Sequence, residues 1–214
     1  MNEVLGFEGC IEQKHERICG FKPAIRQNSV VLVLGTLPGQ KSLEEMGYYS
    51  DPRNNFWRIL FQACGEPFER SNEAQTALLE KYGIALWDVL ESAIRKTSNN
   101  DTPRETSDDK GIREETANDL PGLLAKYPTI KLILFHSNDA YKYFQKHFKN
   151  TTIPYIRVAS PSGQNRKNIE EKALEWKAAL SSVIPQIQMP HRLERKNKFI
   201  SGIMTQKKEV RIEK

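Results

Sequence analysis

The sequence predicts an α/β fold: a three-layer α/β/α sandwich around a short, mostly parallel sheet. Two kinds of segment predict it. Apolar runs at residues 30–34 and 130–135 lack the polar alternation of a half-exposed strand, which is typical of strands buried on both faces. Segments with helical periodicity lie between such runs, and this alternation indicates βαβ units joined in a parallel sheet.

Two shorter apolar runs extend the predicted sheet. Residues 153–158 form a third run, which ends in the turn-rich stretch 160–163. Residues 84–87 are apolar as well, but so short a run does not distinguish a strand from a buried helical turn. We therefore expect three strands, with residues 84–87 as a candidate fourth.

Two of the expected helices have recognisable starts. Asp51 followed by Pro52 is typical of an N-cap with proline in the first helical position, and residues 56–64 supply an apolar stripe behind it. Asn168 with Glu171 three residues later resembles a capping box, and apolar side chains follow at helical spacing. One helix is therefore expected from Asp51 and another from Asn168.

The remaining segments differ in their polarity. Residues 120–127 and 140–148 have helical apolar periods and are expected to form two more helices. Residues 96–118 consist mainly of Asn, Asp, Thr, Ser and Glu, with almost no apolar side chains. We expect a long surface loop over that stretch.

The net charge of the chain is concentrated at one end. The 214 residues include 32 Lys and Arg against 27 Asp and Glu, a balance of +5. Residues 186–214 alone contain eight basic and three acidic side chains, so residues 1–185 are neutral. This distribution excludes a globally basic nucleic-acid-binding body and restricts polyanion binding to a local patch or to the tail.

Length and composition indicate one domain. We expect a single domain over residues 1–185, with its core at about 21–184, and a basic C-terminal extension over 186–214. No apolar run has membrane-spanning length, and the first twenty residues lack a signal-peptide profile. The protein is therefore expected to be intracellular, and cytoplasmic if its source is prokaryotic.

Cys10, Cys19 and Cys64 have no metal-ligand spacing and are expected to be buried free thiols.

Three loops rich in small residues follow the expected strands. They are residues 35–39, 136–138 and 160–166, and in a parallel sheet all three lie at the carboxyl edge, where ligands bind. No Gly-x-Gly-x-x-Gly or Walker-type sequence follows the first strand, and no Gly-x-Ser-x-Gly surrounds Ser160 or Ser162. A dinucleotide, nucleoside triphosphate or serine-hydrolase site is therefore poorly supported.

Residues 47–57 are the most unusual stretch of the sequence. Tyr48 and Tyr49 lie close to two asparagines, and an exposed aromatic ring beside amides suits the binding of a planar heterocycle. The alternative is that both tyrosines are ordinary surface rings. Phe56 and Trp57 are expected to belong to the core.

These motifs carry a resemblance to a known family. The chain resembles the uracil-DNA glycosylase superfamily, in particular its hypoxanthine-DNA glycosylase branch, which is related to the mismatch-specific uracil/thymine-DNA glycosylases. The first motif block is specific, and the later pieces are weaker and continue the match in order. The matching segments are residues 35–39, 42–43, 48–57, 83–90, 118–120 and 160–162.

The resemblance implies a monofunctional glycosylase that flips a deaminated base out of duplex DNA and hydrolyses its N-glycosidic bond without a metal or cofactor. Hypoxanthine and uracil are the implied substrates, and the relatives are generally monomers that do not bind membranes. In the mismatch-specific relatives an asparagine positions the attacking water, and Leu37 occupies that place here. Asn54 is the candidate replacement, as a catalytic residue that positions water.

The resemblance also assigns the remaining site residues. The base pocket is expected to contain Tyr49, Leu37, Thr36, His136 and Asn138, with Tyr49 stacking on the flipped base. The DNA-binding surface is expected to contain Pro38, Gly39, Ser160, Pro161, Ser162, Gly163, Gln164 and Arg166. Within it, Gln164 or Arg166 would fill the space that the base vacates, and backbone amides near Gly39 and Ser162 would bind phosphates.

The sequence departs from the family in two of its motifs. Asp51 stands where the family has histidine, and His136 and Ser137 replace Asn-Gly. His136 could donate to the leaving base or be a hydrogen-bonded structural histidine, and Asn54 could equally brace the first helical turn. A non-catalytic damage-binding module and an enzyme acting on a free nucleoside therefore stay open as alternatives.

Overall fold

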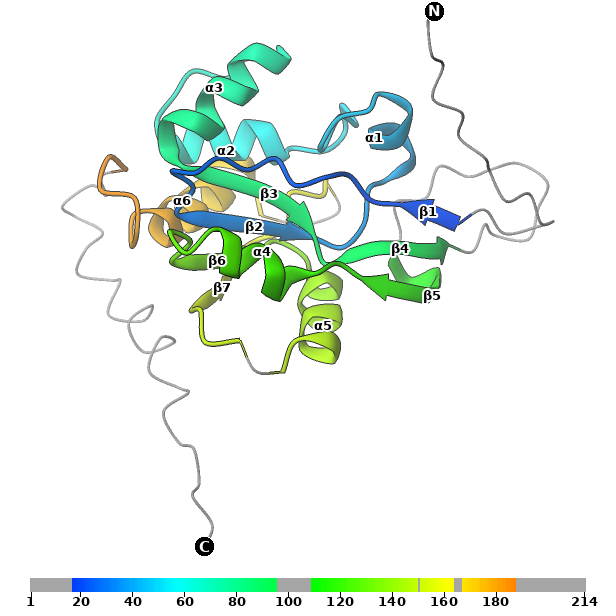
Figure 1. Ribbon diagram of the computed structural model, residues 1–214. Coiled ribbons are helices and arrows are strands. Elements are labelled where there is room, and N and C mark those ends of the chain that lie inside the picture. Colours follow the sequence, from blue (N-terminus) through cyan, green and yellow to red (C-terminus); the bar gives the residue numbers. More distant parts are fainter. Residues whose placement is uncertain (1–16, 96–108, 150, 164–166, 188–214) are drawn as a thin grey trace, which may run out of the picture.

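Four parallel strands form the central sheet of the molecule. The computed structural model describes residues 17–95, 109–149, 151–163 and 167–187 (Figure 1). The strand order is β3-β2-β6-β7, and Val31 of β2 pairs with Ile84 of β3 on one side and Leu132 of β6 on the other. The strands are β2 (Val31–Gly35), β3 (Ile84–Asp88), β6 (Leu132–Phe135) and β7 (Tyr155–Arg157). The candidate strand at 84–87 is thus confirmed.

Helices cover both faces of this sheet. Val31 and Val33 face the helices α2 (Phe56–Cys64), α3 (Asn72–Tyr82) and α6 (Ile169–Leu180). Leu32 and Leu34, which alternate with them along β2, face α4 (Leu120–Lys126) and α5 (Asn138–His147) on the opposite side. Because β2 is apolar on both faces, it separates two core clusters, and the predicted three-layer α/β/α sandwich is confirmed.

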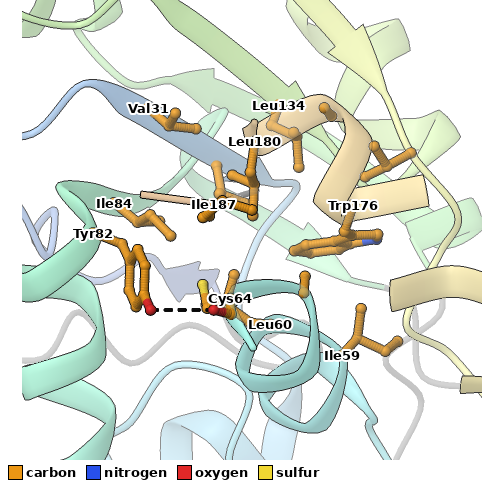
Figure 2. Close-up of a cluster of buried hydrophobic side chains, with 14 of the residues drawn as sticks. Val31, Ile59, Leu60, Cys64, Tyr82, Ile84, Leu134, Trp176, Leu180 and Ile187 are labelled. Carbon is orange, nitrogen blue, oxygen red and sulfur yellow. Dashed lines mark hydrogen bonds between the residues drawn. The ribbon is translucent and has the colours of Figure 1, made fainter. Parts of the chain in front are cut away.

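One core cluster lies between the sheet and the layer of α2, α3 and α6. Trp176 is fully buried there, and its indole Nε1 donates a 2.9 Å hydrogen bond to the Ala159 carbonyl. Figure 2 shows part of this cluster, in which Tyr82 Oη donates to the Cys64 carbonyl at 3.1 Å. Ile187 is also buried in it, so the packed chain continues two residues beyond the predicted domain end at 185.

A smaller antiparallel sheet corrects the expectation of a loop over residues 96–118 for its last part, while residues 96–108 lie outside the described residues. Its strands, in spatial order, are β1 (Arg17–Cys19), β4 (Leu90–Arg95) and β5 (Ile112–Ala117), and a 3₁₀ turn, η1 (Asp109–Gly111), precedes β5. The segment 112–117 was expected to be a loop because its sequence is polar, and in the structure none of its side chains is fully buried. Backbone pairing with β4 makes it a strand without an apolar signature.

The expected helix start at Asp51 is also wrong. Residues 52–53 form a turn, and α2 begins only at Phe56. Asp51 Oδ1 accepts from the Arg53 amide and Asn54 Oδ1 accepts from the Phe56 amide, both at 2.9 Å. These local side-chain bonds stabilise a turn in preference to a helix, as short polar side chains commonly do.

The helix start expected at Asn168 is confirmed. Asn168 Oδ1 accepts from the Glu171 amide at 2.8 Å, and Glu171 Oε2 accepts from the Asn168 amide at 3.1 Å, which completes the capping box of α6. A short helix, α1 (Gln40–Glu44), follows the loop after β2.

The cysteines and the tail were only partly predicted. Cys64 is buried and free, and its burial raises the pKa of the thiol to about 12, whereas Cys19 is free but exposed. Cys10 and residues 188–214, including nearly all of the expected extension, lie outside the described residues.

Among the described helices, none combines the length and the apolar character that crossing a membrane requires.

Candidate active site

A cavity of about 690 Å³ opens at the carboxyl edge of the parallel sheet. The three predicted loops meet there, because parallel strands end at the same edge. Side chains that follow β2, β3, β6 and β7 line it together with residues of the turn before α2. Its wall includes Gly35, Thr36, Leu37, Pro38, Gly39, Tyr49, Asn54, Asp88, Asp109, His136, Ser137 and residues 160–163.

Tyr49 is fixed in this wall from three directions. Its backbone lies in the left-handed region at φ 55°, which is uncommon for a residue other than glycine and carries a small energetic cost. Its ring stacks on Phe56 with the centroids 3.6 Å apart and an interplanar angle of 11°. Its hydroxyl lies 2.6 Å from His136 Nε2. Tyr49 is therefore half-buried and held in place, unlike the exposed ring that the sequence suggested.

His136 lies deeper in the same wall. It is buried, and its ring is enclosed by Tyr49, Phe56 and Trp176. Burial lowers the pKa of the imidazole to about 4, so the ring is neutral at neutral pH. A neutral imidazole has one N–H and one acceptor nitrogen, and Tyr49 occupies Nε2.

Asn54 stands at the rim of the cavity, in the turn before α2. Its side-chain Oδ1 accepts a hydrogen bond from the Phe56 backbone N–H. The backbone N–H of Asn54 donates to the Asp51 carbonyl at 2.9 Å. A carbonyl oxygen has two lone pairs, so Oδ1 keeps one for a further donor such as a water molecule. The bracing bond therefore orients the side chain and is compatible with a second role.

Asp51 does not present an uncompensated negative charge beside Asn54. Arg53 forms an ion pair with it at 2.9 Å and also donates through Nε and its backbone amide. These hydrogen bonds hold the pKa of Asp51 below its usual range. The acid that replaces the family's histidine is thus offset by its neighbour.

The loop over residues 160–163 is docked by backbone contacts. The Asn55 amide donates to the Pro161 carbonyl at 3.2 Å, and Lys172 Nζ donates to the Ser162 carbonyl at 2.9 Å. Lys172 is almost completely buried, and burial lowers the pKa of its amine. The loop is therefore tied to both α2 and α6 beside the cavity mouth.

Comparisons with known proteins agree with this geometry. The profile of the uracil DNA glycosylase superfamily matches residues 23–183. The chain belongs to the uracil DNA glycosylase superfamily. The proteins named hypoxanthine DNA glycosylase from Methanosarcina acetivorans and Methanosarcina barkeri are 31% and 30% identical to it. The alignments cover 74% and 75% of this chain and 95% and 96% of those relatives.

A solved structure of this superfamily has the same fold. It is the solution NMR structure of a Methanosarcina acetivorans protein assigned to the uracil DNA glycosylases, with a TM-score of 0.65 and 28% sequence identity. The match covers 78% of this chain and 99% of that one.

Two predicted residues have other placements in this superfamily member. Asn138 is the first residue of α5 and is exposed, and it is absent from the cavity wall described above. Leu37 lines the cavity, but its side chain is buried in the core cluster on the α4 and α5 side. Gln164 and Arg166 lie outside the described residues.

Two carboxyl groups of the cavity wall, the buried Asp88 and the partly buried Asp109, were missed by sequence reasoning. Asp88 is 4% exposed, and burial, assisted by the negative charge of Asp109, raises its pKa to about 7. Asp109 pairs with Arg95 at 3.1 Å, and Arg95 donates to the Pro38 carbonyl at 3.0 Å. The position of Asp88 at the end of a strand was a usable signal, whereas Asp109 stood in an unpatterned polar stretch.

Proposed function

We propose that this chain is a monofunctional DNA glycosylase that hydrolyses the N-glycosidic bond of a deaminated base, hypoxanthine or uracil, in duplex DNA. One observation carries the proposal: Asn54, the Tyr49–His136 pair and Asp88 line one cavity at the sheet edge of a chain in this superfamily. The two relatives named hypoxanthine DNA glycosylase support the choice of base.

The dimensions of the cavity suit an extruded nucleotide. About 690 Å³ lies within the usual range of small-molecule sites, and residues 160–163 form part of the cavity wall. A base inside a duplex is unreachable for such a site, so the nucleotide must leave the stack. We propose that the 160–163 loop, held by Lys172 and Asn55, contacts the strand that remains outside.

The chemistry needs an oriented water molecule and a favourable environment for the departing base. As the bond between the sugar C1′ and the base nitrogen breaks, its electron pair goes to the base and the sugar gains oxocarbenium character. Asn54 Oδ1 holds the water that then bonds to C1′ and loses a proton to solvent. An amide is too weak a base to remove that proton early, so Asn54 acts by positioning.

The second candidate function is a damage-binding module without catalysis. Two observations favour it. Asn54 Oδ1 already accepts a hydrogen bond from the Phe56 amide, and Leu37 is buried in the core at the position where relatives have an asparagine. Such a protein would bind duplexes containing a lesion and leave them intact.

One assay separates these functions. Duplexes with a single hypoxanthine, uracil or xanthine are incubated with the protein and then treated with alkali, which cleaves the strand at an abasic site. We expect cleavage at hypoxanthine or uracil that is absent from the Asn54→Ala protein. Binding without cleavage for every lesion would overturn the glycosylase proposal. Faster hydrolysis of free deoxyinosine than of the duplex lesion would instead indicate a nucleoside hydrolase.

A further inference from the structure

The floor of the cavity includes Thr36 and Asp88, and buried polar atoms there and beside it lack partners. Within the described ranges these atoms are Thr36 Oγ1, Asp88 Oδ2 and Nε of Arg95, which does not line the cavity but bonds to Pro38 and Asp109 of its wall. Thr36 lies near the Asp109 carboxylate, but its hydroxyl has no partner in hydrogen-bond geometry. Native proteins leave very few buried polar atoms unpaired, so three in one place require a cause. Asp88 and Thr36 line the cavity, which points to a ligand group as their missing partner.

Asp88 occupies a defined position in this floor. It ends β3 directly beside Gly35, its partner at the end of β2. A Cβ atom on Gly35 would collide with Asp88 Oδ1 and would lie 3.0 Å from Tyr49 Oη, so both groups fill the space above this glycine. The absence of a side chain at Gly35 therefore allows Asp88 to stand next to the Tyr49–His136 pair.

His136 is poorly suited to donate to a departing base. Its Nε2 is engaged with Tyr49 at 2.6 Å, and only one proton can lie between the two atoms. The ring is neutral, and aromatic rings enclose it. A different group must offer a hydrogen bond to the base, and Asp88 is the polar side chain beside this pair that lacks a partner on Oδ2.

We propose that the Asp88 carboxyl group binds the lactam edge of the flipped base and donates a hydrogen bond to it as it leaves. This inference rests on the proposed glycosylase function. A carboxylic acid offers one donor and one acceptor, which match the carbonyl oxygen and the adjacent N–H of hypoxanthine or uracil. As the glycosidic electron pair moves onto the base, negative charge grows on that carbonyl oxygen, so the donated bond strengthens in the transition state.

The charges around Asp88 favour its acid form. Burial and, to a smaller extent, the carboxylate of Asp109 in η1 raise its pKa to about 7, and the Arg95 guanidinium from β4 opposes this rise. Tyr48 and Tyr49 also face it, and burial raises the pKa of both hydroxyls, so they stay neutral. At pH 6 the acid is therefore present, and above pH 7 a carboxylate would repel the departing anion.

The test compares single-turnover excision of hypoxanthine by the wild type, Asp88→Asn and Asp88→Ala from pH 5.5 to 8, below the titration of the hypoxanthine lactam. The wild-type rate should fall about tenfold per pH unit beyond the titration of Asp88. Asp88→Asn keeps a donor and an acceptor, so its rate should be within about threefold of wild type at pH 6 and flat to pH 8. Asp88→Ala should lose roughly 100-fold at pH 6, where the wild type carries the acid, and its low rate should not change with pH.

Asp109→Asn is the matched control, because this neighbouring carboxyl is paired with Arg95 and acts on Asp88 only by its charge. Loss of the Asp109 charge should lower the pKa of Asp88, so the excision rate should begin to fall at a lower pH than in the wild type. An unchanged alkaline fall in Asp88→Asn, or a wild-type rate in Asp88→Ala, would overturn the proposal. Circular dichroism of each variant checks that it is folded.

A binding measurement separates this inference from the proposed function. The probe is a duplex with a 2′-fluorinated deoxyinosine that resists hydrolysis, titrated at constant salt at pH 6 and pH 8. Wild-type affinity should fall several-fold with this rise in pH, and Asp88→Asn affinity should not. Affinities that change equally in both proteins would overturn the role of Asp88, whatever the excision assay shows for the wild type.

Discussion

The inner wall and the rim of the cavity are built differently. The inner wall, formed by Tyr49, Asp88, Asp109 and His136, is mostly buried, and burial shifts the pKa of each of its side chains. The rim, formed by Asn54 and residues 160–163, is polar and tied down mainly through backbone atoms. A dry wall strengthens hydrogen bonds to a base, whereas a wetter rim suits water and phosphates. Under the proposed function, recognition of the base and handling of the sugar would be separated in space.

The largest expected effect is that of Asn54→Ala at the rim. In the proposed mechanism the amide orients the water, so we expect its loss to lower the single-turnover excision rate roughly 100- to 1,000-fold. Affinity for the lesion duplex should change little, since the inner wall is intact. Rates are measured at saturating protein and affinity by anisotropy. A fall in affinity as large as the fall in rate would show that Asn54 acts in binding.

A second prediction concerns the inner wall and stability. Asp88 holds its proton up to about pH 7 in the folded protein, against about 3.8 when unfolded, so the folded state loses stability as pH rises between these values. The loss is on the order of 3–4 kcal/mol. Asp88→Asn should therefore melt several degrees above wild type at pH 8 and close to it at pH 4. Thermal melts followed by circular dichroism check this difference, and equal melting temperatures at pH 8 would contradict it.

The contribution of His136 to folding stability changes with pH in the opposite direction to that of Asp88 between pH 4 and 6.5. Its pKa is about 4 when folded against 6.5 when unfolded, so the unfolded chain takes up more protons between these values. Folding stability from His136 therefore falls as pH drops from 6.5 to 4. In the wild type the two contributions oppose each other there, and Asp88→Asn should uncover acid destabilisation between pH 6.5 and 4.

A smaller effect is expected for Lys172→Met beneath the rim. Methionine keeps most of the apolar stem and removes the donor to the Ser162 carbonyl, so the 160–163 loop loses one of its ties. One hydrogen bond of this kind contributes about 1 kcal/mol, so duplex affinity should weaken roughly three- to tenfold. The excision rate at saturating protein should stay near wild type. A lower rate with unchanged affinity would assign Lys172 to the chemistry.

The smallest effect on excision is expected from removal of residues 188–214. The tail carries the whole net charge of +5, and contacts to about five phosphates would steepen the salt dependence of binding by roughly 0.9 per contact. Because Ile187 is buried in the core, truncation should begin after it. The salt slope is measured by anisotropy from low to physiological salt. An unchanged slope would show that the tail does not contact DNA.

Much of the scaffold was predictable because its signals are local. Strands β2 and β6 are apolar on every residue that faces a helix layer. The capping box of α6 consists of two side chains that are close in sequence. The strand β5 was not predictable, because half-exposed edge residues carry no periodic apolar signal. The start of α2 was misplaced because Asp51 and Asn54 stabilise a turn with the same chemistry that caps a helix.

The site was predictable at its rim and less so in its inner wall. Loops rich in small residues mark a sheet edge, and the resemblance located Asn54 and residues 160–163 on it. Whether a carboxyl group is exposed, paired or buried without a partner depends on neighbours distant in sequence. Asp88 meets Asp109 and Tyr49 only in the folded chain, so its pKa and its role follow from tertiary packing.

The most direct test of the account is to measure the free base itself. A duplex with one hypoxanthine is incubated with excess protein, and the released base is quantified by chromatography alongside the alkali-labile sites. The account predicts hypoxanthine and abasic sites in equal amounts, with no release from an undamaged duplex and almost none from Asn54→Ala. A stable complex with the lesion duplex and no free base would contradict it.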